Sequence, residues 1–181
     1  MKSMTTLPAA AFTRADLEAM PDDGRRHELI DGVLVVTPAP TSEHQAALRE
    51  LVRAMLTACP PEFEFMFAPL DVVLADDTVL QPDLLVARPR DITSHGLMVA
   101  PLLAVEVLSP STRRIDLTLK RSRYEAAGTA SYWIVDPVVR SLRSWDLVDG
   151  SYAEIAHVTG DDVFHAIRPF PITIRPSDLG R

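Results

Sequence analysis

Apolar residues recur at helical spacing in two long stretches, and each stretch ends at residues typical of helix boundaries. The first helix is predicted from about residue 42, after Thr41 or Ser42 as the N-cap, to 58; its apolar positions include Ala47, Leu48, Leu51, Val52 and Met55. The second is predicted over 113–127, with Gly128 just beyond its end. A short helix over 14–20 precedes both.

Strand patterns fill most of the remaining chain. Strands are predicted over 27–30, 33–37, 70–75, 79–87, 102–109, 131–135, 139–147 and 152–157, with a last short one at Ile172 and Ile174. The dipeptide Asp31-Gly32 favours a two-residue hairpin turn between the first two. Segment 102–109 is nearly all apolar, which is typical of a central strand covered on both faces.

The order of these elements favours a mixed sheet over a regular parallel one. A helix, a hairpin, a helix, several strands, a helix and more strands follow one another, without internal repeats or Gly/Ser linkers. The 181 residues fit one domain over 1–181, with a core from about 13 to 175. We therefore predict an α/β fold of the α+β kind, in which helices flank a mixed sheet.

Composition narrows the class of protein further. No apolar run approaches the ~20 residues of a membrane span. The first eleven residues lack the apolar core of a signal peptide. Cys59 is the only cysteine, so neither an intrachain disulfide nor a cysteine zinc cluster can form. These features favour a cytoplasmic location.

The charge is unevenly distributed along the chain. The formal net charge is −7, whereas a general nucleic-acid binder carries a basic surface. Residues 113–123 nevertheless hold five basic residues and one acidic residue, a local net charge of +4. A solvated helix face is the ordinary explanation. Contact with nucleic-acid phosphates is the functional alternative, and its candidates are Arg113, Arg114 and Arg121.

Two acids lie on predicted strands. Glu106 interrupts the apolar segment 102–109, where a carboxylate is costly unless it meets a cation, binds a metal or stays protonated. Asp83 follows Pro82, which places it at the mouth of its strand. The alternatives are a core ion pair for Glu106 and a turn hydrogen bond for Asp83.

A lysine lies on the helix that follows Glu106. Asp116, Lys120 and Tyr124 share one helical face at spacings of four. They form either a surface ion pair or an ammonium and a phenol directed at a phosphate. Two acids with a lysine close by suit Mg²⁺-dependent phosphodiester hydrolysis, because Mg²⁺ prefers oxygen ligands and activates water.

The motifs, taken in order, resemble those of a known family. They are HELIDG at 27–32, QPD at 81–83, VEVLSPST at 105–112, the Asp116, Lys120 and Tyr124 series, AG at 127–128 and YWIVDP at 132–137. This set resembles the Uma-two family of restriction-endonuclease-like proteins, within the PD-(D/E)XK nuclease superfamily. The resemblance runs from about residue 13 to the end of the chain.

The resemblance implies a restriction-endonuclease-like fold and specific roles. Asp83 and Glu106 would bind Mg²⁺ or Mn²⁺, and Lys120 would be the catalytic lysine. The superfamily lysine usually lies two residues after the acid, where this chain has Leu108. The lysine function would therefore have moved to the following helix, as it does in the family that the chain resembles.

Two further candidates are an early acid and a histidine. Glu28 lies on the first hairpin strand, where nucleases of this fold often place an acid near the metal; an exposed strand glutamate is the alternative. His44 shares a helical face with Leu48, Leu51 and Met55, so it points inward. The resemblance places it beside the active site, whereas the residue pattern alone indicates a core histidine.

Three functions are compatible with these sequence features. The first is a metal-dependent endonuclease acting on nucleic acid, with DNA as the expected substrate; a homodimer would suit cleavage of two strands, although no sequence feature requires it. The second is a catalytically weak or inactive nuclease fold used for binding nucleic acid or protein, which the net charge and the displaced lysine favour. The third is a protein-interaction module of a mobile-element or defence system.

Overall fold

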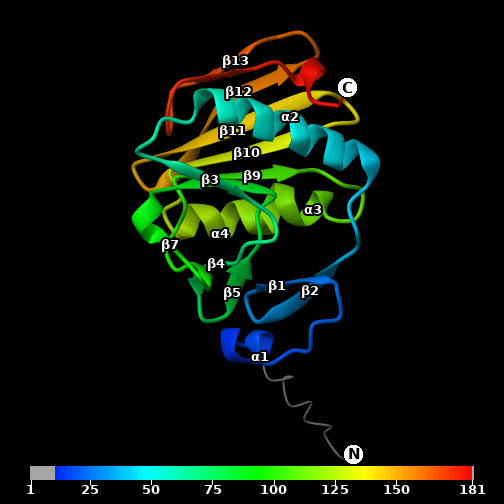
Figure 1. The fold of residues 1–181 in the computed structure, drawn as a ribbon, viewed down its shortest axis with the longest axis vertical. Helices are drawn as coiled ribbons and strands as arrows, with labels where there is room; N and C mark the ends of the chain where they lie inside the picture. The colour runs from blue at the N-terminus through cyan, green and yellow to red at the C-terminus, as the bar shows by residue number, and fades with distance from the viewer. Residues whose placement is uncertain (1–10, 181) are drawn as a thin grey trace, which may run out of the picture.

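The computed structural model describes residues 11–180, and its elements form two six-stranded sheets with helices between and outside them (Figure 1). The segment 1–10, where the sequence predicts no signal peptide, lies outside the described residues. Within residues 11–180, no helix has the length and apolar character needed to cross a membrane.

The central sheet has the strand order β12-β11-β10-β9-β6-β3. Its members are β3 (Glu64–Phe67), β6 (Leu84–Ala87), β9 (Leu103–Val107), β10 (Ser131–Asp136), β11 (Ser141–Val148) and β12 (Ser151–Thr159). Strand β9 pairs parallel with β10 and antiparallel with β6, so the sheet is mixed. All five residues of β9 are buried, as expected for a central strand.

The second sheet has the order β2-β1-β5-β4-β8-β7. Its members are β1 (Arg26–Ile30), β2 (Val33–Thr37), β4 (Val72–Ala75), β5 (Thr78–Leu80), β7 (Ile92–Thr93) and β8 (Gly96–Leu97). Asp31 and Gly32 join β1 to β2 with φ values of 52° and 74°. Two successive positive φ angles are typical of a type I′ turn, and the predicted two-residue hairpin turn is of this type.

Helices cover both faces of the central sheet. Helix α2 (Ser42–Ala58), capped by the Thr41 side chain, lies on one face (Figure 1). The other face is covered by one continuous helical segment that consists of α3 (Arg113–Ile115), the π-helical turn η2 (Asp116–Lys120) and α4 (Arg121–Ala126). The remaining elements are α1 (Arg14–Glu18), η1 (Pro89–Asp91), η3 (Pro176–Asp178) and the two-stranded sheet of β13 (Phe164–Ala166) and β14 (Ile172–Ile174).

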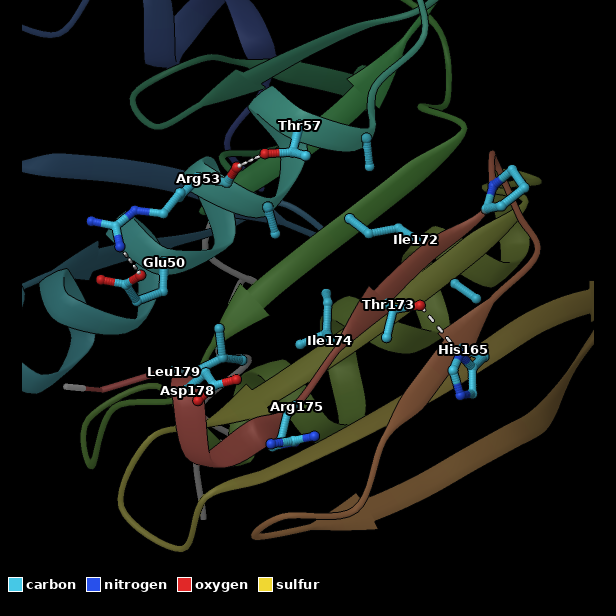
Figure 2. Close-up of a pocket in the computed structure, with 14 residues that line it drawn as sticks. Glu50, Arg53, Thr57, His165, Ile172, Thr173, Ile174, Arg175, Asp178 and Leu179 are labelled. Carbon is cyan, nitrogen blue, oxygen red and sulfur yellow. Dashed lines mark hydrogen bonds and ion pairs between the residues drawn. The ribbon is translucent and has the colours of Figure 1, made fainter.

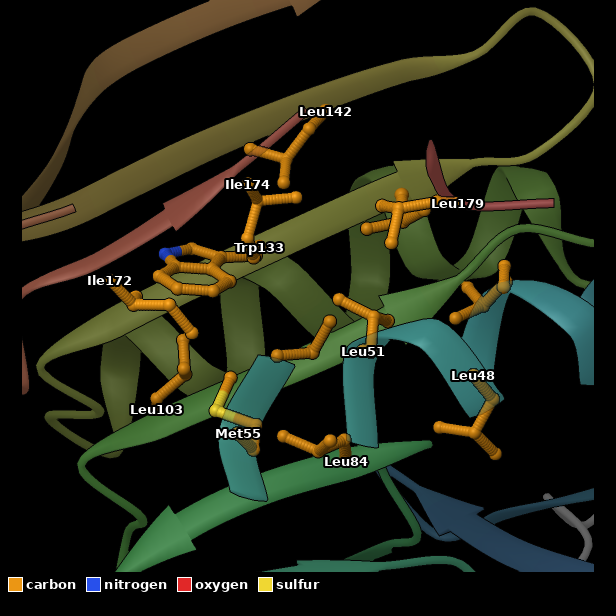
Figure 3. Close-up of a cluster of buried hydrophobic side chains, with 14 of the residues drawn as sticks. Leu48, Leu51, Met55, Leu84, Leu103, Trp133, Leu142, Ile172, Ile174 and Leu179 are labelled. Atoms are coloured by element: carbon orange, nitrogen blue, oxygen red, sulfur yellow. The ribbon is translucent and has the colours of Figure 1, made fainter. Parts of the chain in front are cut away.

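The main core lies between α2 and the central sheet. Figure 3 shows Leu51 and Met55 of α2 packed over Leu103 and Trp133 of the sheet. The Trp133 ring also meets Phe164 edge to face, with 5.1 Å between ring centroids. A second core, which includes Ala104, Leu108, Tyr124, Tyr132 and Trp145, fills the opposite face of the sheet.

The predicted α/β class with helices flanking mixed sheets is confirmed, but some element boundaries are wrong. The strand predicted over 79–87 is two strands, because Gln81-Pro82-Asp83 leaves the ladder between β5 and β6. The helix predicted over 113–127 contains the π-helical turn η2. The short strands β3, β7, β8 and β13 have no counterpart among the predicted elements.

Helix α2 provides a direct test of the core. Leu51 is 0% exposed and Leu56, on the same helix, is 71% exposed. We expect Leu51→Ala to lower the free energy of unfolding by about 2–5 kcal/mol, because it removes buried methyl groups and leaves a cavity. Leu56→Ala should change it by less than about 0.5 kcal/mol. Urea unfolding of both variants measures the difference, and equal losses would contradict this packing.

Candidate active site

Four separate segments deliver charged side chains to one cavity of about 220 Å³. Strand β1 contributes Glu28, the residue before β6 is Asp83, and β9 contributes Glu106. Turn η2 contributes Asp116 and Lys120. All five side chains are buried, although they are far apart in the sequence.

Strand alternation explains why Glu106 faces this cavity. Residues at every second position of a strand share a face, so Glu106 lies on the same face of β9 as Ala104 and Leu108. Both of those residues belong to the second core, beside α4. Glu106 thus points toward the helical segment that carries Lys120.

The Lys120 ammonium is surrounded by three carboxylates. Its Nζ lies 2.9 Å from Glu28 Oε1, 3.1 Å from Glu106 Oε1 and 3.5 Å from Asp116 Oδ1. Glu28 Oε1 also accepts a hydrogen bond of 2.7 Å from the backbone N–H of Gln81. The lysine therefore ties β1, β9 and η2 together at one point.

Asp83 is held from three directions. Its Oδ2 accepts a hydrogen bond from the Val107 backbone N–H at 2.8 Å and lies 3.0 Å from His44 Nε2. Its Oδ1 accepts a hydrogen bond from Arg26 Nη1 at 2.9 Å. Since Pro82 interrupts the strand just before it, Asp83 turns toward the β9 backbone instead of pairing in the ladder.

The environment shifts the pKa values of these groups in opposite directions. Burial opposes ionisation of Asp83, but the hydrogen bond from His44 and the charge of Arg26 outweigh it and lower its pKa to about 2. Burial raises the pKa of Glu106 well above its usual range, despite the charge of Lys120. Burial also raises the pKa of Asp116. For Lys120 the neighbouring carboxylates outweigh burial, so its pKa is raised and it stays protonated.

Arg26 is a site residue that the sequence analysis missed. Its guanidinium lies between Asp83, Glu28 and Glu106, with Nη2 at 3.5 Å from Glu28 Oε1 and 4.0 Å from Glu106 Oε2. A signal was present, because Arg26 precedes Glu28 by two residues on one strand and therefore shares its face.

The π-helical turn η2 was not predicted from the sequence either. Such turns are rare and occur frequently at functional sites. Here η2 begins at Asp116 and ends at Lys120, and both side chains are buried at the cavity. The Asp116 backbone carbonyl accepts a hydrogen bond from the Tyr132 hydroxyl at 2.9 Å, which anchors the turn to the central sheet.

The structure places Tyr124 away from the cavity wall. Its ring is buried in the second core and packs against Tyr132, with 5.2 Å between ring centroids. Burial raises the pKa of its hydroxyl well above the usual range. The hydroxyl is buried, and none of residues 11–180 forms a hydrogen bond with it. Tyr124 therefore lies behind the acid cluster rather than beside it.

The basic run 113–123 does not form one continuous positive surface. Lys120 faces the interior, Arg113 pairs with Asp136, and Arg123 pairs with Asp31. The Arg121 guanidinium lies 5.2 Å from the centre of the Trp145 ring. Arg114 is exposed. Most of the predicted phosphate contacts thus have partners within the chain.

The charges at the site suit an additional cation. Four carboxylates face two permanent cations, Arg26 and Lys120, which leaves a net charge of −2 when all four carboxylates are ionised and His44 is neutral. In addition, the buried Glu28 Oε2 has no hydrogen-bond partner in the described part of the chain. Carboxylate oxygens are the ligands that Mg²⁺ and Mn²⁺ prefer. Within residues 11–180, however, no three such side chains are already arranged around a common metal position.

A larger cavity, of about 870 Å³, lies between α2 and β14 (Figure 2). Its floor is apolar and includes Ile172, Ile174 and Leu179, as Figure 2 shows. The Glu50 carboxylate at its rim is paired with Arg53 at 3.2 Å. This cavity lacks the buried acids of the smaller one, so the smaller cavity is the candidate active site.

The fold and the acid–lysine site define a restriction-endonuclease-like protein. The chain matches the Uma2 family, described as "Putative restriction endonuclease", over residues 14–176 and belongs to that family. Its fold is similar to a crystal structure from Anabaena variabilis described as a "putative nuclease belonging to DUF820". The TM-score is 0.73 at 20% identity, covering 93% of this chain and 97% of the other. Curated proteins yield no match.

The ionised state of Asp83 gives a pH-dependent test of the site. Because its folded pKa of about 2 lies below the unfolded value of ~3.9, its ionisation stabilises the fold above pH ~4 and loses this effect as the pH falls toward 2. Urea unfolding in the presence of a chelator should show that Asp83→Asn is less stable than wild type by about 2 kcal/mol at pH 7. The deficit should shrink toward pH 2, and a constant deficit would contradict this assignment.

Proposed function

We propose that the chain is a divalent-metal-dependent endonuclease that hydrolyses phosphodiester bonds of nucleic acid, with DNA as the expected substrate. The observation that carries this proposal is the convergence of Glu28, Asp83, Glu106 and Lys120 on one cavity. Buried acids with perturbed pKa values are costly for stability and cluster at functional sites. Membership in the Uma2 family supports the same chemistry.

Asp83 and Glu106 are the proposed metal ligands, with Glu28 contributing its unpaired oxygen. Mg²⁺ or Mn²⁺ held there would polarise a phosphoryl oxygen and lower the pKa of a coordinated water. Lys120 stays protonated, so it does not act as a base. Its positive charge beside Glu106 fixes the orientation of that carboxylate and offsets negative charge in the cavity.

His44 is the proposed proton acceptor. The Asp83 carboxylate is ionised and lies 3.0 Å from His44 Nε2, so it accepts a hydrogen bond from an Nε2–H. In a neutral imidazole this tautomer leaves a lone pair on Nδ1. Within residues 11–180, Nδ1 has no hydrogen-bond partner, so its lone pair is not already used by another donor.

A nuclease fold retained for binding is the second candidate. The internal cations Arg26 and Lys120 already neutralise part of the acid cluster, and the net charge of the chain is −7. Under this alternative, the acids stabilise the fold or a binding surface without turnover. A homodimer, which would suit cleavage of both strands, stays a prediction.

A plasmid-nicking assay with Mg²⁺ and with Mn²⁺ separates the two candidates. Asp83→Ala, Glu106→Ala and Lys120→Ala should each lower the cleavage rate by roughly 10²-fold or more, because each removes a group that positions charge at the reacting phosphate. Addition of EDTA should abolish cleavage by the wild type.

Glu62→Ala is the matched control, since Glu62 is an exposed acid and does not line the active-site cavity. It should cleave at the wild-type rate. Circular dichroism must show that every variant is folded. If folded wild type leaves duplex DNA, single-stranded DNA and RNA intact, the binding alternative replaces the nuclease.

A further inference from the structure

Arg26 lies among the same acids that are proposed to bind the metal. Its guanidinium donates to Asp83 at 2.9 Å and approaches Glu106 to 4.0 Å and Glu28 to 3.5 Å. One planar cation thus contacts three acids from β1, β9 and the start of β6. Lys120 forms ion pairs with Glu28 and Glu106 from the helical side.

This cation cannot be removed by loss of a proton. An arginine keeps its charge at every physiological pH, unlike a lysine or a histidine. Here the carboxylates of Glu28, Glu106 and Asp83 outweigh burial and raise its pKa further. The guanidinium can leave the acids only if the side chain moves.

We propose that Arg26 is an internal counter-ion that a divalent cation displaces, so that its ion pairs with Asp83 and Glu106 and metal binding exclude each other. This inference rests on the proposed metal site. It accounts for two features of the site. The four ionised carboxylates together with Arg26 and Lys120 have a net charge of −2, which suits a divalent cation, yet no set of three ligands is already arranged within residues 11–180. The guanidinium occupies the space between the acids.

The surroundings of Arg26 permit this movement. Its side chain is 21% exposed, whereas Lys120 is 2% exposed, so Arg26 lies on the open side of the cluster. Among the residues that the structure describes, its Nε has no hydrogen-bond partner that would hold the stem of the side chain in place. After displacement the guanidinium stays at the cavity rim, where its planar fork matches the oxygens of a phosphate. The same residue then changes from a competitor of the metal into a contact for the substrate.

Calorimetric titration with MgCl₂ and with MnCl₂, without nucleic acid, tests the competition. Arg26→Gln should bind either metal at least tenfold more tightly than wild type. Arg25→Gln is the matched control, because Arg25 is its neighbour in sequence but is exposed and faces Asp23 at 3.9 Å. Its metal affinity should equal that of wild type. Equal affinities for wild type and Arg26→Gln, or no metal binding by either, would overturn the proposal.

A second measurement on the wild-type protein separates displacement from simple charge repulsion. The Nε–H resonance of Arg26, assigned by its loss in Arg26→Lys, should shift on saturation with diamagnetic Mg²⁺, and the Arg25 resonance should not. Saturable Mg²⁺ binding with an unshifted Arg26 resonance would overturn displacement. Neither experiment contains nucleic acid, so neither result depends on cleavage. If Arg26 moves on metal binding but the nicking assay shows no cleavage, the nuclease proposal is refuted and this inference stands.

Discussion

The buried ammonium of Lys120 is the interaction on which the rest of the site depends. It contacts Glu28, Glu106 and Asp116, three carboxylates that would otherwise repel one another in a water-poor interior. Removal of one partner from such a cluster leaves uncompensated charge, whereas the intact cluster holds three chain segments in one geometry. The two sheets and the helical segment therefore meet at a point fixed by charge as well as by apolar packing.

Asp83 extends this arrangement to the other side of β9. Its bond from the Val107 N–H ties the loop before β6 to the central sheet, and its contact with His44 ties it to the first turn of α2. The Asp83–His44 pair also lines both the acid cavity and a second cavity of about 480 Å³ on the α2 side. Asp83 and His44 thus separate the two cavities, and a molecule bound in either cavity would lie beside the same two side chains.

Much of the fold and part of the site could be predicted from the sequence. Glu106 is a lone acid in an apolar strand, and Asp83 follows a proline at the mouth of a strand, so the local sequence marks both positions. The spacing of four from Asp116 to Lys120 places these two residues on one helical face. Turn η2 was not predicted, because its first and last residues contact segments that are distant in sequence: the Asp116 carbonyl accepts a hydrogen bond from Tyr132, and Lys120 pairs with Glu106. Arg26 was overlooked because its partners are distant in sequence, although it lies on the same face of β1 as Glu28.

The π-helical turn also bears on how such a site can be gained or lost. A π turn holds one residue more than an α turn, so deletion of a single residue within 116–120 would restore a regular helix. A π turn accommodates its extra residue as a local bulge, so the helix before and after the deletion would keep the faces that it packs against the sheet. The change would fall on the turn itself, whose first and last residues, Asp116 and Lys120, both line the cavity. The length of the helical segment at η2 thus concerns the acid cluster more than it concerns the packing of the fold.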